Sequence, residues 1–156
     1  MKKFFAIILT FTLLICNAGC SNSNSNSNKL TAFYNKVSES QQLLDAVADT
    51  IYSNWYDAVY KDKFNKNINS ATNFALLLHS NDLERIESLE IEIKDLFKSL
   101  KDDKKHGSLV KDVMSAYSNY YVLVVNVSGS FKSYAAEKEK TKKELVGLLK
   151  DLWYEI

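Results

Sequence analysis

The chain has 156 residues, of which 46% are hydrophobic and 25% charged, and its formal net charge at pH 7 is +1. This composition is typical of one globular domain and excludes collagen-like, mucin-like and wholly disordered chains. Two Cys and two His are too few for a disulfide scaffold or a zinc ribbon, and the near-zero net charge lacks the excess of Lys and Arg that nucleic-acid binding needs, so we expect no metal, no cofactor and no nucleic-acid partner.

Residues 1–19 have the three parts of a secretory signal peptide. Lys2 and Lys3 form a cationic start, Phe4 to Cys16 an apolar stretch, and the small residues Ala18 and Gly19 follow. The apolar stretch of about 13 residues is shorter than the roughly 20 that a membrane-spanning helix needs. The segment therefore predicts export from the cytoplasm.

The sequence Asn17-Ala18-Gly19-Cys20 resembles the lipobox of bacterial lipoproteins, in which small residues precede an invariant cysteine. The resemblance covers the first 20 residues. It implies that the signal is cut before Cys20, that this cysteine carries fatty-acyl chains such as palmitate, and that the protein is lipid-anchored in the cell membrane, facing outside the cytoplasm. Two or three acyl chains make a stable anchor, since each buried CH₂ contributes about 0.8 kcal/mol. Cys20 is the predicted lipidation site; Cys16 is a poorer candidate, because bulky Ile15 precedes it.

Ser21 to Asn28 consists of four Ser-Asn repeats without an apolar side chain. Such a polar low-complexity tract predicts a flexible tether over residues 20–29. The helical bundle domain is then expected over residues 30–156.

From Leu30 onward, apolar residues recur at helical spacing and predict one long helix from about Leu30 to Asp62. The stripe comprises Leu30, Phe33, Val37, Leu44, Val47, Ile51, Trp55, Ala58 and Val59. After a polar break, steps of three and four predict a second helix from Ile68 to Leu100. Asp82 interrupts its stripe, so a break near Ser80 is the alternative to the continuous helix that we favour.

A third stripe, from Val110 to Tyr134, also has helical spacing, although Val122 to Val127 is rich in β-branched residues. Gly129 weakens a helix and is expected to kink or split it. An apolar face continues to Ile156. The predicted fold is all-α: an antiparallel bundle of three long helices, the third kinked or split near Gly129, with a four-helix bundle as the alternative.

This bundle would gather aromatic and polar residues at the end far from the tether, which is the composition of a recognition surface. The predicted partner-binding residues are Trp55, Tyr56, Tyr60, Asn67, Ser130 and Phe131. The competing interpretation is a solvated helix end above an aromatic core.

Catalytic chemistry has no recognisable pattern in the sequence, and we predict no catalytic residues and no enzyme. His79 and His106 lack paired metal ligands, and Glu90, Glu92 and Asp95 have the spacing of a solvated helix face. The sequence instead predicts a non-enzymatic interaction protein of the cell envelope, with an envelope or extracellular protein as partner.

Architecture and anchor together resemble immunity or phage superinfection-exclusion lipoproteins. The alternative function is a carrier that holds a small apolar ligand between its helices. An internal cavity distinguishes a carrier from a tightly packed interaction module.

Overall fold

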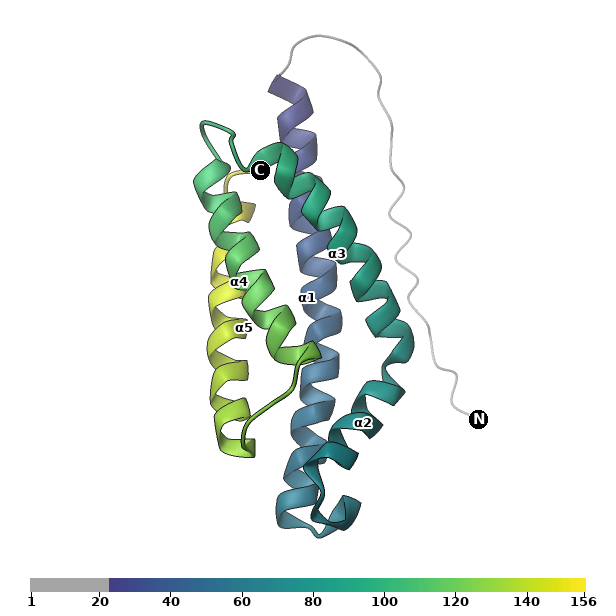
Figure 1. Ribbon diagram of the computed structural model, residues 1–156. Coiled ribbons are helices and arrows are strands. Elements are labelled where there is room, and N and C mark those ends of the chain that lie inside the picture. Colours follow the sequence, from purple (N-terminus) through teal and green to yellow (C-terminus); the bar gives the residue numbers. More distant parts are fainter. Residues whose placement is uncertain (1–22) are drawn as a thin grey trace, which may run out of the picture.

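The computed structural model describes residues 23–156, and every regular element in them is helical. The predicted signal peptide and Cys20 lie outside the described residues. In chain order the elements are α1 (Ser23–Tyr60), the short 3₁₀ helix η1 (Lys63–Lys66), α2 (Ile68–Leu78), α3 (Ser80–Leu100), α4 (Gly107–Val125) and α5 (Phe131–Trp153). The predicted all-α fold class is confirmed for this part of the chain (Figure 1).

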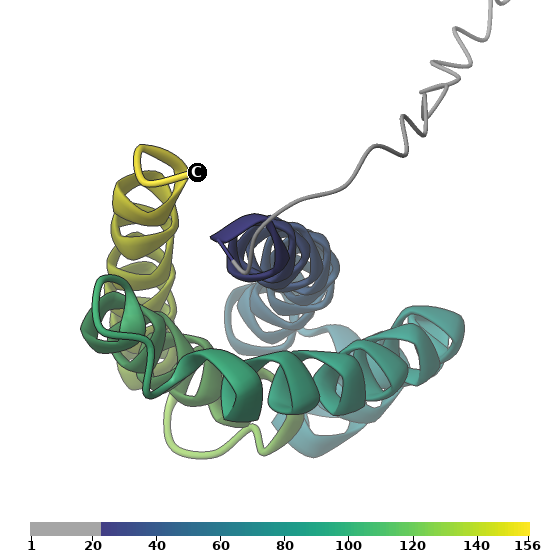
Figure 2. The same ribbon diagram turned by 90° about the horizontal axis from the view of Figure 1, so that it is seen from above.

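Helix α1 is the central element and contacts every other element of the described chain. Its 38 residues span about 57 Å at 1.5 Å per residue. Seen from above, α1 lies on the inner side of a curved layer formed by α5, α4 and α3 (Figure 2). Its predicted apolar stripe is buried from Leu30 to Ala58, whereas Val59, the last residue of the stripe, is 45% exposed.

Helix α1 begins at Ser23, inside the segment that we expected to be a flexible tether. The Asn26 side-chain amide donates to Asp103 Oδ2 over 3.0 Å, which ties this end of α1 to the α3–α4 turn. Lengthening an existing helix needs no new nucleation, so even a Ser-Asn tract continues it. The expected tether over residues 20–29 is therefore helical from Ser23 onward.

The predicted continuous helix over 68–100 is wrong, because it divides into α2 and α3 at His79. His79 Nε2 lies 2.8 Å from Thr50 Oγ1 on α1, and His79 Nδ1 lies 2.6 Å from Asp82 Oδ2 on α3. These two hydrogen bonds fix the junction against α1. Asp82, which interrupts the apolar stripe, is thus a partner of the residue at the break, and the alternative break near Ser80 is the one observed.

Helices α4 and α5 are antiparallel neighbours rather than the two halves of one bent helix (Figure 1). The chain reverses in the linker 126–130, where Gly129 has φ +90°, a conformation that other residues rarely adopt. The predicted split near Gly129 is confirmed, but the count of three long helices is wrong: the described chain forms five α-helices. Helix α1, the α2–α3 pair, α4 and α5 run alternately in opposite directions, which is closer to the four-helix alternative.

Three tyrosines are buried in the core between α1, α4 and α5. The Tyr120 hydroxyl donates to Asp45 Oδ1 over 2.5 Å, and the Tyr117 hydroxyl lies 3.0 Å from Ser40 Oγ. The Tyr134 hydroxyl is buried and has no hydrogen-bond partner among the described residues. Burial raises the pKa of Tyr117 to about 12 and also raises the pKa values of Tyr120 and Tyr134.

Candidate functional site

Three tyrosines stand four residues apart near the end of α1 that lies farthest from Ser23: Tyr52, Tyr56 and Tyr60. Residues four apart lie on one face of a helix, one above the other. Their exposed fractions increase toward the helix end, from 37% for Tyr52 to 41% for Tyr56 and 63% for Tyr60. The row is therefore mostly covered at Tyr52 and mostly exposed at Tyr60.

Phe131, the first residue of α5, lies against all three tyrosines. Its ring centroid is 5.1 Å from that of Tyr52, 6.1 Å from Tyr56 and 5.7 Å from Tyr60, and the last pair is edge-to-face. The rings of Tyr56 and Tyr60 are 5.0 Å apart. Each such pair contributes about 0.5–1.5 kcal/mol beyond its area burial. We call Tyr52, Tyr56, Tyr60 and Phe131 the distal aromatic surface.

The start of α5 is fixed by a capping box, which holds Phe131 in place. The Ser133 N–H donates to Ser130 Oγ over 3.2 Å, and the Ser130 N–H donates to Ser133 Oγ over 2.9 Å. Both amides would otherwise lack a partner at the helix start. Ser130 therefore acts as a helix cap beside the distal aromatic surface.

Lysines border the distal aromatic surface. Lys61 Nζ lies 5.2 Å from the ring centroid of Tyr56, and Lys138 Nζ lies 5.1 Å from that of Tyr52, which are cation–π distances. Asp57 accepts from Lys63 over 2.7 Å and from Lys61 over 2.9 Å. These lysines lower the pKa of Asp57, and Asp57 in turn raises the pKa of Lys61. Lys138 is paired with Asp49 and its side chain is only 8% exposed, so the groups bordering the rings carry both signs of charge.

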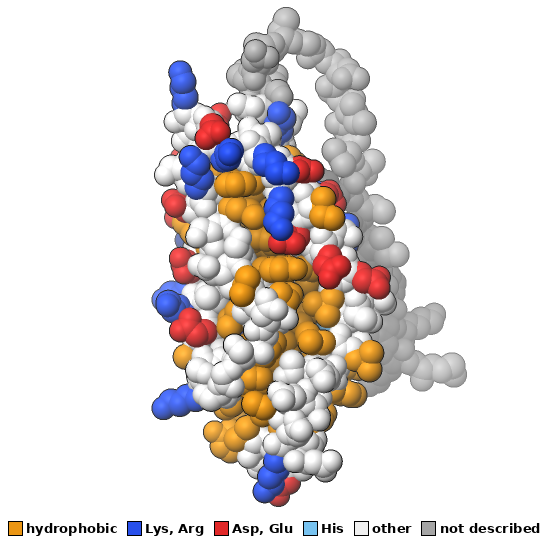
Figure 3. Space-filling view, in the orientation of Figure 1, with side chains coloured by type: hydrophobic (Ala, Val, Ile, Leu, Met, Phe, Trp, Pro, Cys, Tyr) orange, Lys and Arg blue, Asp and Glu red, His pale blue; other side chains and the backbone are white. Residues whose placement is uncertain are grey.

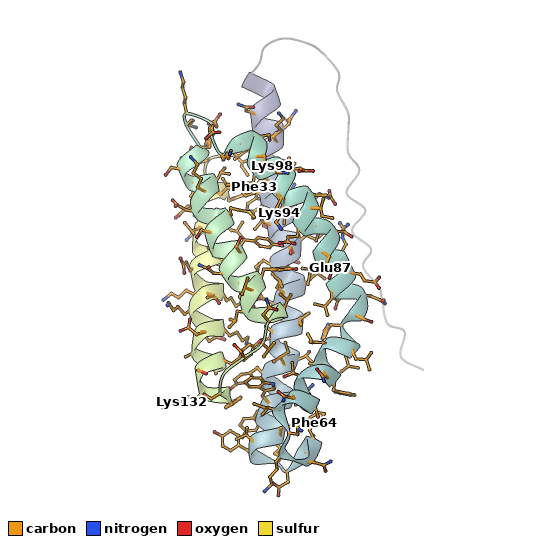
Figure 4. The ribbon with its side chains drawn as sticks, viewed as in Figure 1. Phe33, Phe64, Glu87, Lys94, Lys98 and Lys132 are labelled. Carbon is orange, nitrogen blue, oxygen red and sulfur yellow. The ribbon has the colours of Figure 1, made fainter. Side chains whose placement is uncertain are left out.

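The turn after α1 has an unusual backbone. Four non-glycine residues have φ between 52° and 60°: Asp62, Phe64, Asn65 and Lys66. The left-handed region is costly for side chains with a Cβ, and such strain persists where surrounding contacts impose it. Phe64 packs on Phe74 of α2 at 5.6 Å, and Asn67 caps α2 by accepting from the amides of Asn69 and Ser70. Phe64 and Lys132 both lie at this end of the bundle (Figure 4).

The structure brings together three of the predicted partner-binding residues, Tyr56, Tyr60 and Phe131. Trp55 does not belong to this surface: it is 2% exposed, and its indole N–H donates to Thr72 Oγ1 over 2.5 Å. It points into the core because it lies on the buried stripe of α1, so the competing interpretation of an aromatic core holds for Trp55. Asn67 and Ser130 are exposed helix caps. We did not predict Tyr52, although its spacing from Tyr56 is visible in the sequence.

Hydrogen bonds connect a hydroxyl, an imidazole and a carboxylate in the order found in nucleophilic catalytic sites. These groups belong to Thr50, His79 and Asp82. The Thr50 hydroxyl also lies 3.0 Å from the Ala46 carbonyl of its own helix, as expected of a threonine inside a helix. The three residues join α1 to the α2–α3 break, and this structural role accounts for their contacts.

The remaining candidate residues of the sequence are in ion pairs or near helix starts. Glu90 pairs with Lys94 and Glu92 with Lys36, each at 2.8 Å. His106 precedes the first turn of α4, and its Nδ1 lies 3.2 Å from Asp103. Among residues 23–156, no three His, Cys, Asp or Glu side chains are grouped as metal ligands.

Comparisons with known proteins give no relative. No protein-family model matches the chain, and neither a curated protein nor a solved structure matches it significantly. None of the helices in the described part combines the length and the apolarity needed to cross a lipid bilayer.

Proposed function

We propose that the protein is a lipoprotein anchored through acylated Cys20 in the cell membrane, and that its helical domain is a non-enzymatic protein-interaction module outside the cytoplasm. The observation that carries this proposal is the distal aromatic surface, at the end of α1 opposite to Ser23 (Figure 1). An anchor at one end of a long helix leaves the other end accessible to a partner.

The chemistry of the distal aromatic surface suits a protein partner. Tyrosine contributes a large rigid ring with a polar tip and is enriched among residues that dominate binding energy. Tyr60 is 63% exposed although it already contacts Tyr56 and Phe131, so a partner could bury more of it without rearranging the helix. The lysines beside this surface are paired with acidic side chains, Lys61 and Lys63 with Asp57 and Lys138 with Asp49. Recognition of an envelope or extracellular protein, as by an immunity or phage-exclusion factor, would therefore rest on the aromatic rings.

Photo-crosslinking in cells tests this proposal. A photoreactive amino acid is placed at position 56 or 60, and at position 146 as the control, because Val146 has a similar exposure of 44% on α5. We expect one envelope protein to be captured from 56 and 60 but not from 146, and to be lost in the Cys20→Ser variant. Confirmed acylation without specific capture would refute the interaction surface, and absence of acylation would refute the anchor.

A second candidate function is the carrier of a small apolar ligand, favoured by a pocket between α2, α3 and α4. The pocket has a volume of about 200 Å³, is partly open to solvent, and is lined by Leu76, Leu83, Ile86, Glu87, Tyr121 and Val125. Hydrophobic side chains form a band down this face, with charged side chains above it and along its sides (Figure 3). Native mass spectrometry of the purified protein would show a bound apolar molecule, and Val125→Trp, which fills the pocket, should remove it and leave crosslinking at position 60 intact.

A further inference from the structure

The pocket between α2, α3 and α4 combines apolar walls with a single carboxylate. It lies where α3 and α4 diverge from each other toward α2 (Figure 1). Its apolar lining residues are Leu76, Leu83, Ile86 and Val125. Glu87 is the only charged residue among those that line it. Helix α2 contains no charged side chain and α4 contains none after Asp112, so the charge that the pocket presents to a ligand comes from α3.

The carboxylate of Glu87 has no ion-pair partner among the described residues, unlike those of the next two glutamates of α3. Glu90 pairs with Lys94 at 2.8 Å. Glu92 pairs with Lys36 on α1, also at 2.8 Å. The pocket therefore has a negative group at its mouth whose charge no neighbouring side chain of the described chain neutralises.

Tyr121 of α4 supplies the second polar group of the pocket. It is partly buried, and its hydroxyl has no hydrogen-bond partner among the described residues. Partial burial raises the pKa of this hydroxyl, the charges of Glu90 and Glu87 raise it further, and Lys94 partly offsets them. The electrostatic potential beside the Tyr121 hydroxyl is therefore negative, which favours a cation there.

The volume of the pocket, about 200 Å³, is that of a site for a small molecule. An apolar cavity of about 150 Å³ is large enough to bind benzene. The pocket can therefore hold an aromatic ring or a short alkyl chain, with room for one polar group at the mouth. It is too small for a helix of another protein, which has a diameter of about 10 Å.

We propose that this pocket binds a small amphiphilic amine, with its apolar part between α2, α3 and α4 and its ammonium group at Glu87 and Tyr121. A primary ammonium group has three N–H donors and no acceptor, so it suits two oxygen atoms that lack a partner. Burial of the apolar part holds the ammonium group beside the carboxylate, which a freely mobile pair in water would not achieve. This ligand class rests on the carrier function proposed above and makes it specific.

Three probes that share an aromatic ring and differ in their polar group test the ligand class. Phenethylamine is a cation at neutral pH, phenethyl alcohol is neutral, and phenylacetate is an anion. Each is titrated by calorimetry into the purified full-length chain in lipid nanodiscs, and empty nanodiscs correct for probe that dissolves in the lipid. We expect phenethylamine to bind about tenfold more tightly than phenethyl alcohol, because charge-assisted hydrogen bonds are the stronger ones. Phenylacetate should not bind, since its charge has the same sign as that of Glu87.

Substitutions of Glu87 separate the effect of its charge from that of the apolar walls. Glu87→Gln keeps the size of the side chain, so the affinity for phenethylamine should fall about tenfold while that for phenethyl alcohol changes by less than about twofold. Glu87→Lys should reverse the preference, so that phenylacetate binds and phenethylamine does not. Glu84→Gln is the matched control: Glu84 is also exposed on α3 and has no ion-pair partner among the described residues, but it does not line the pocket. All three affinities should be unchanged in this control.

The outcomes distinguish the ligand class from the carrier function. Equal affinities of the amine and the alcohol for the native chain, or an amine affinity that is unchanged in Glu87→Gln, would overturn the ligand class and leave the carrier function standing. Absence of binding by all three probes overturns the ligand class, and the carrier function as well if native mass spectrometry finds no bound apolar molecule. Val125→Trp fills the pocket and should abolish binding of the amine. An amine that still binds this variant in its folded state lies elsewhere, which also overturns the proposal.

Discussion

The three buried tyrosines offer an internal comparison, because their hydroxyls have different partners. Tyr120 donates to the Asp45 carboxylate, Tyr117 lies beside the Ser40 hydroxyl, and the Tyr134 hydroxyl has no partner among the described residues. Replacement of each by phenylalanine removes one oxygen atom and leaves the ring in place. The three changes therefore measure how much each hydroxyl contributes to the free energy of unfolding when the rings are similarly buried.

The expected effects on the free energy of unfolding differ in size and in sign. Tyr120→Phe removes a hydrogen bond to a charged acceptor and should cost about 1.5–3 kcal/mol, whereas Tyr117→Phe removes a bond between neutral groups and should cost about 0.5–1.5 kcal/mol. Tyr134→Phe removes a buried hydroxyl that was already unpaired, so it should be neutral or stabilising by up to about 1 kcal/mol.

Urea unfolding followed by circular dichroism at pH 7 measures the three differences in the free energy of unfolding. The comparison requires that this free energy falls with urea concentration at the same slope in all variants. Tyr60→Phe, on the exposed distal aromatic surface, is the control and should change stability by less than about 0.5 kcal/mol. If Tyr134→Phe destabilises the protein as much as Tyr120→Phe does, the hydroxyl of Tyr134 has a partner and the reasoning is refuted.

Further predictions concern glycines, an acidic turn and the aromatic residues. Gly129→Ala should cost about 1–2 kcal/mol because of its φ of +90°, whereas Gly147→Ala, with open space around it inside α5, should stabilise by about 0.5–1 kcal/mol; thermal unfolding measures both. The backbone amides of His106 and Lys105 lower the pKa of Asp103 in the folded protein below its usual value. The ionised Asp103 therefore stabilises the fold above its unfolded-state pKa, and this contribution is lost as the pH falls through the lower pKa of the folded state. Asp103→Asn should accordingly reduce the loss of stability between about pH 5 and pH 2 in acid titrations. Trp55→Ala should cost about 3–5 kcal/mol in urea unfolding, and Tyr60→Ala less than about 1.5 kcal/mol.

The buried side of α1 was predictable from the sequence because helical spacing records which face meets the core. Residues from Leu30 to Ala58 on the predicted stripe are buried, and the predicted cluster of Tyr56, Tyr60 and Phe131 forms. Burial of Trp55 follows from the same stripe, so the sequence already contained the reason to exclude it from the surface. Tyr52 could have been predicted from its spacing of four residues from Tyr56.

The breaks between helices were harder to predict, because they depend on contacts between segments distant in the chain. His79 ends α2 with hydrogen bonds to Thr50, 29 residues earlier, and to Asp82. A local pattern shows only that Asp82 is polar at an apolar position.

The reversal after α4 explains how the distal aromatic surface arises. The linker 126–130 leaves helical geometry, and Ser130 is extended with φ −99° and ψ 159°. Five residues span up to about 17 Å when extended but only about 7.5 Å in a helix. The linker therefore carries the chain past the end of α4 to the distal end of α1, and α5 starts there with Phe131 against three tyrosines. A continuous bent helix would have placed Phe131 only about 9 Å beyond Val125 along the axis, so the loss of helix near Gly129 is what completes this surface.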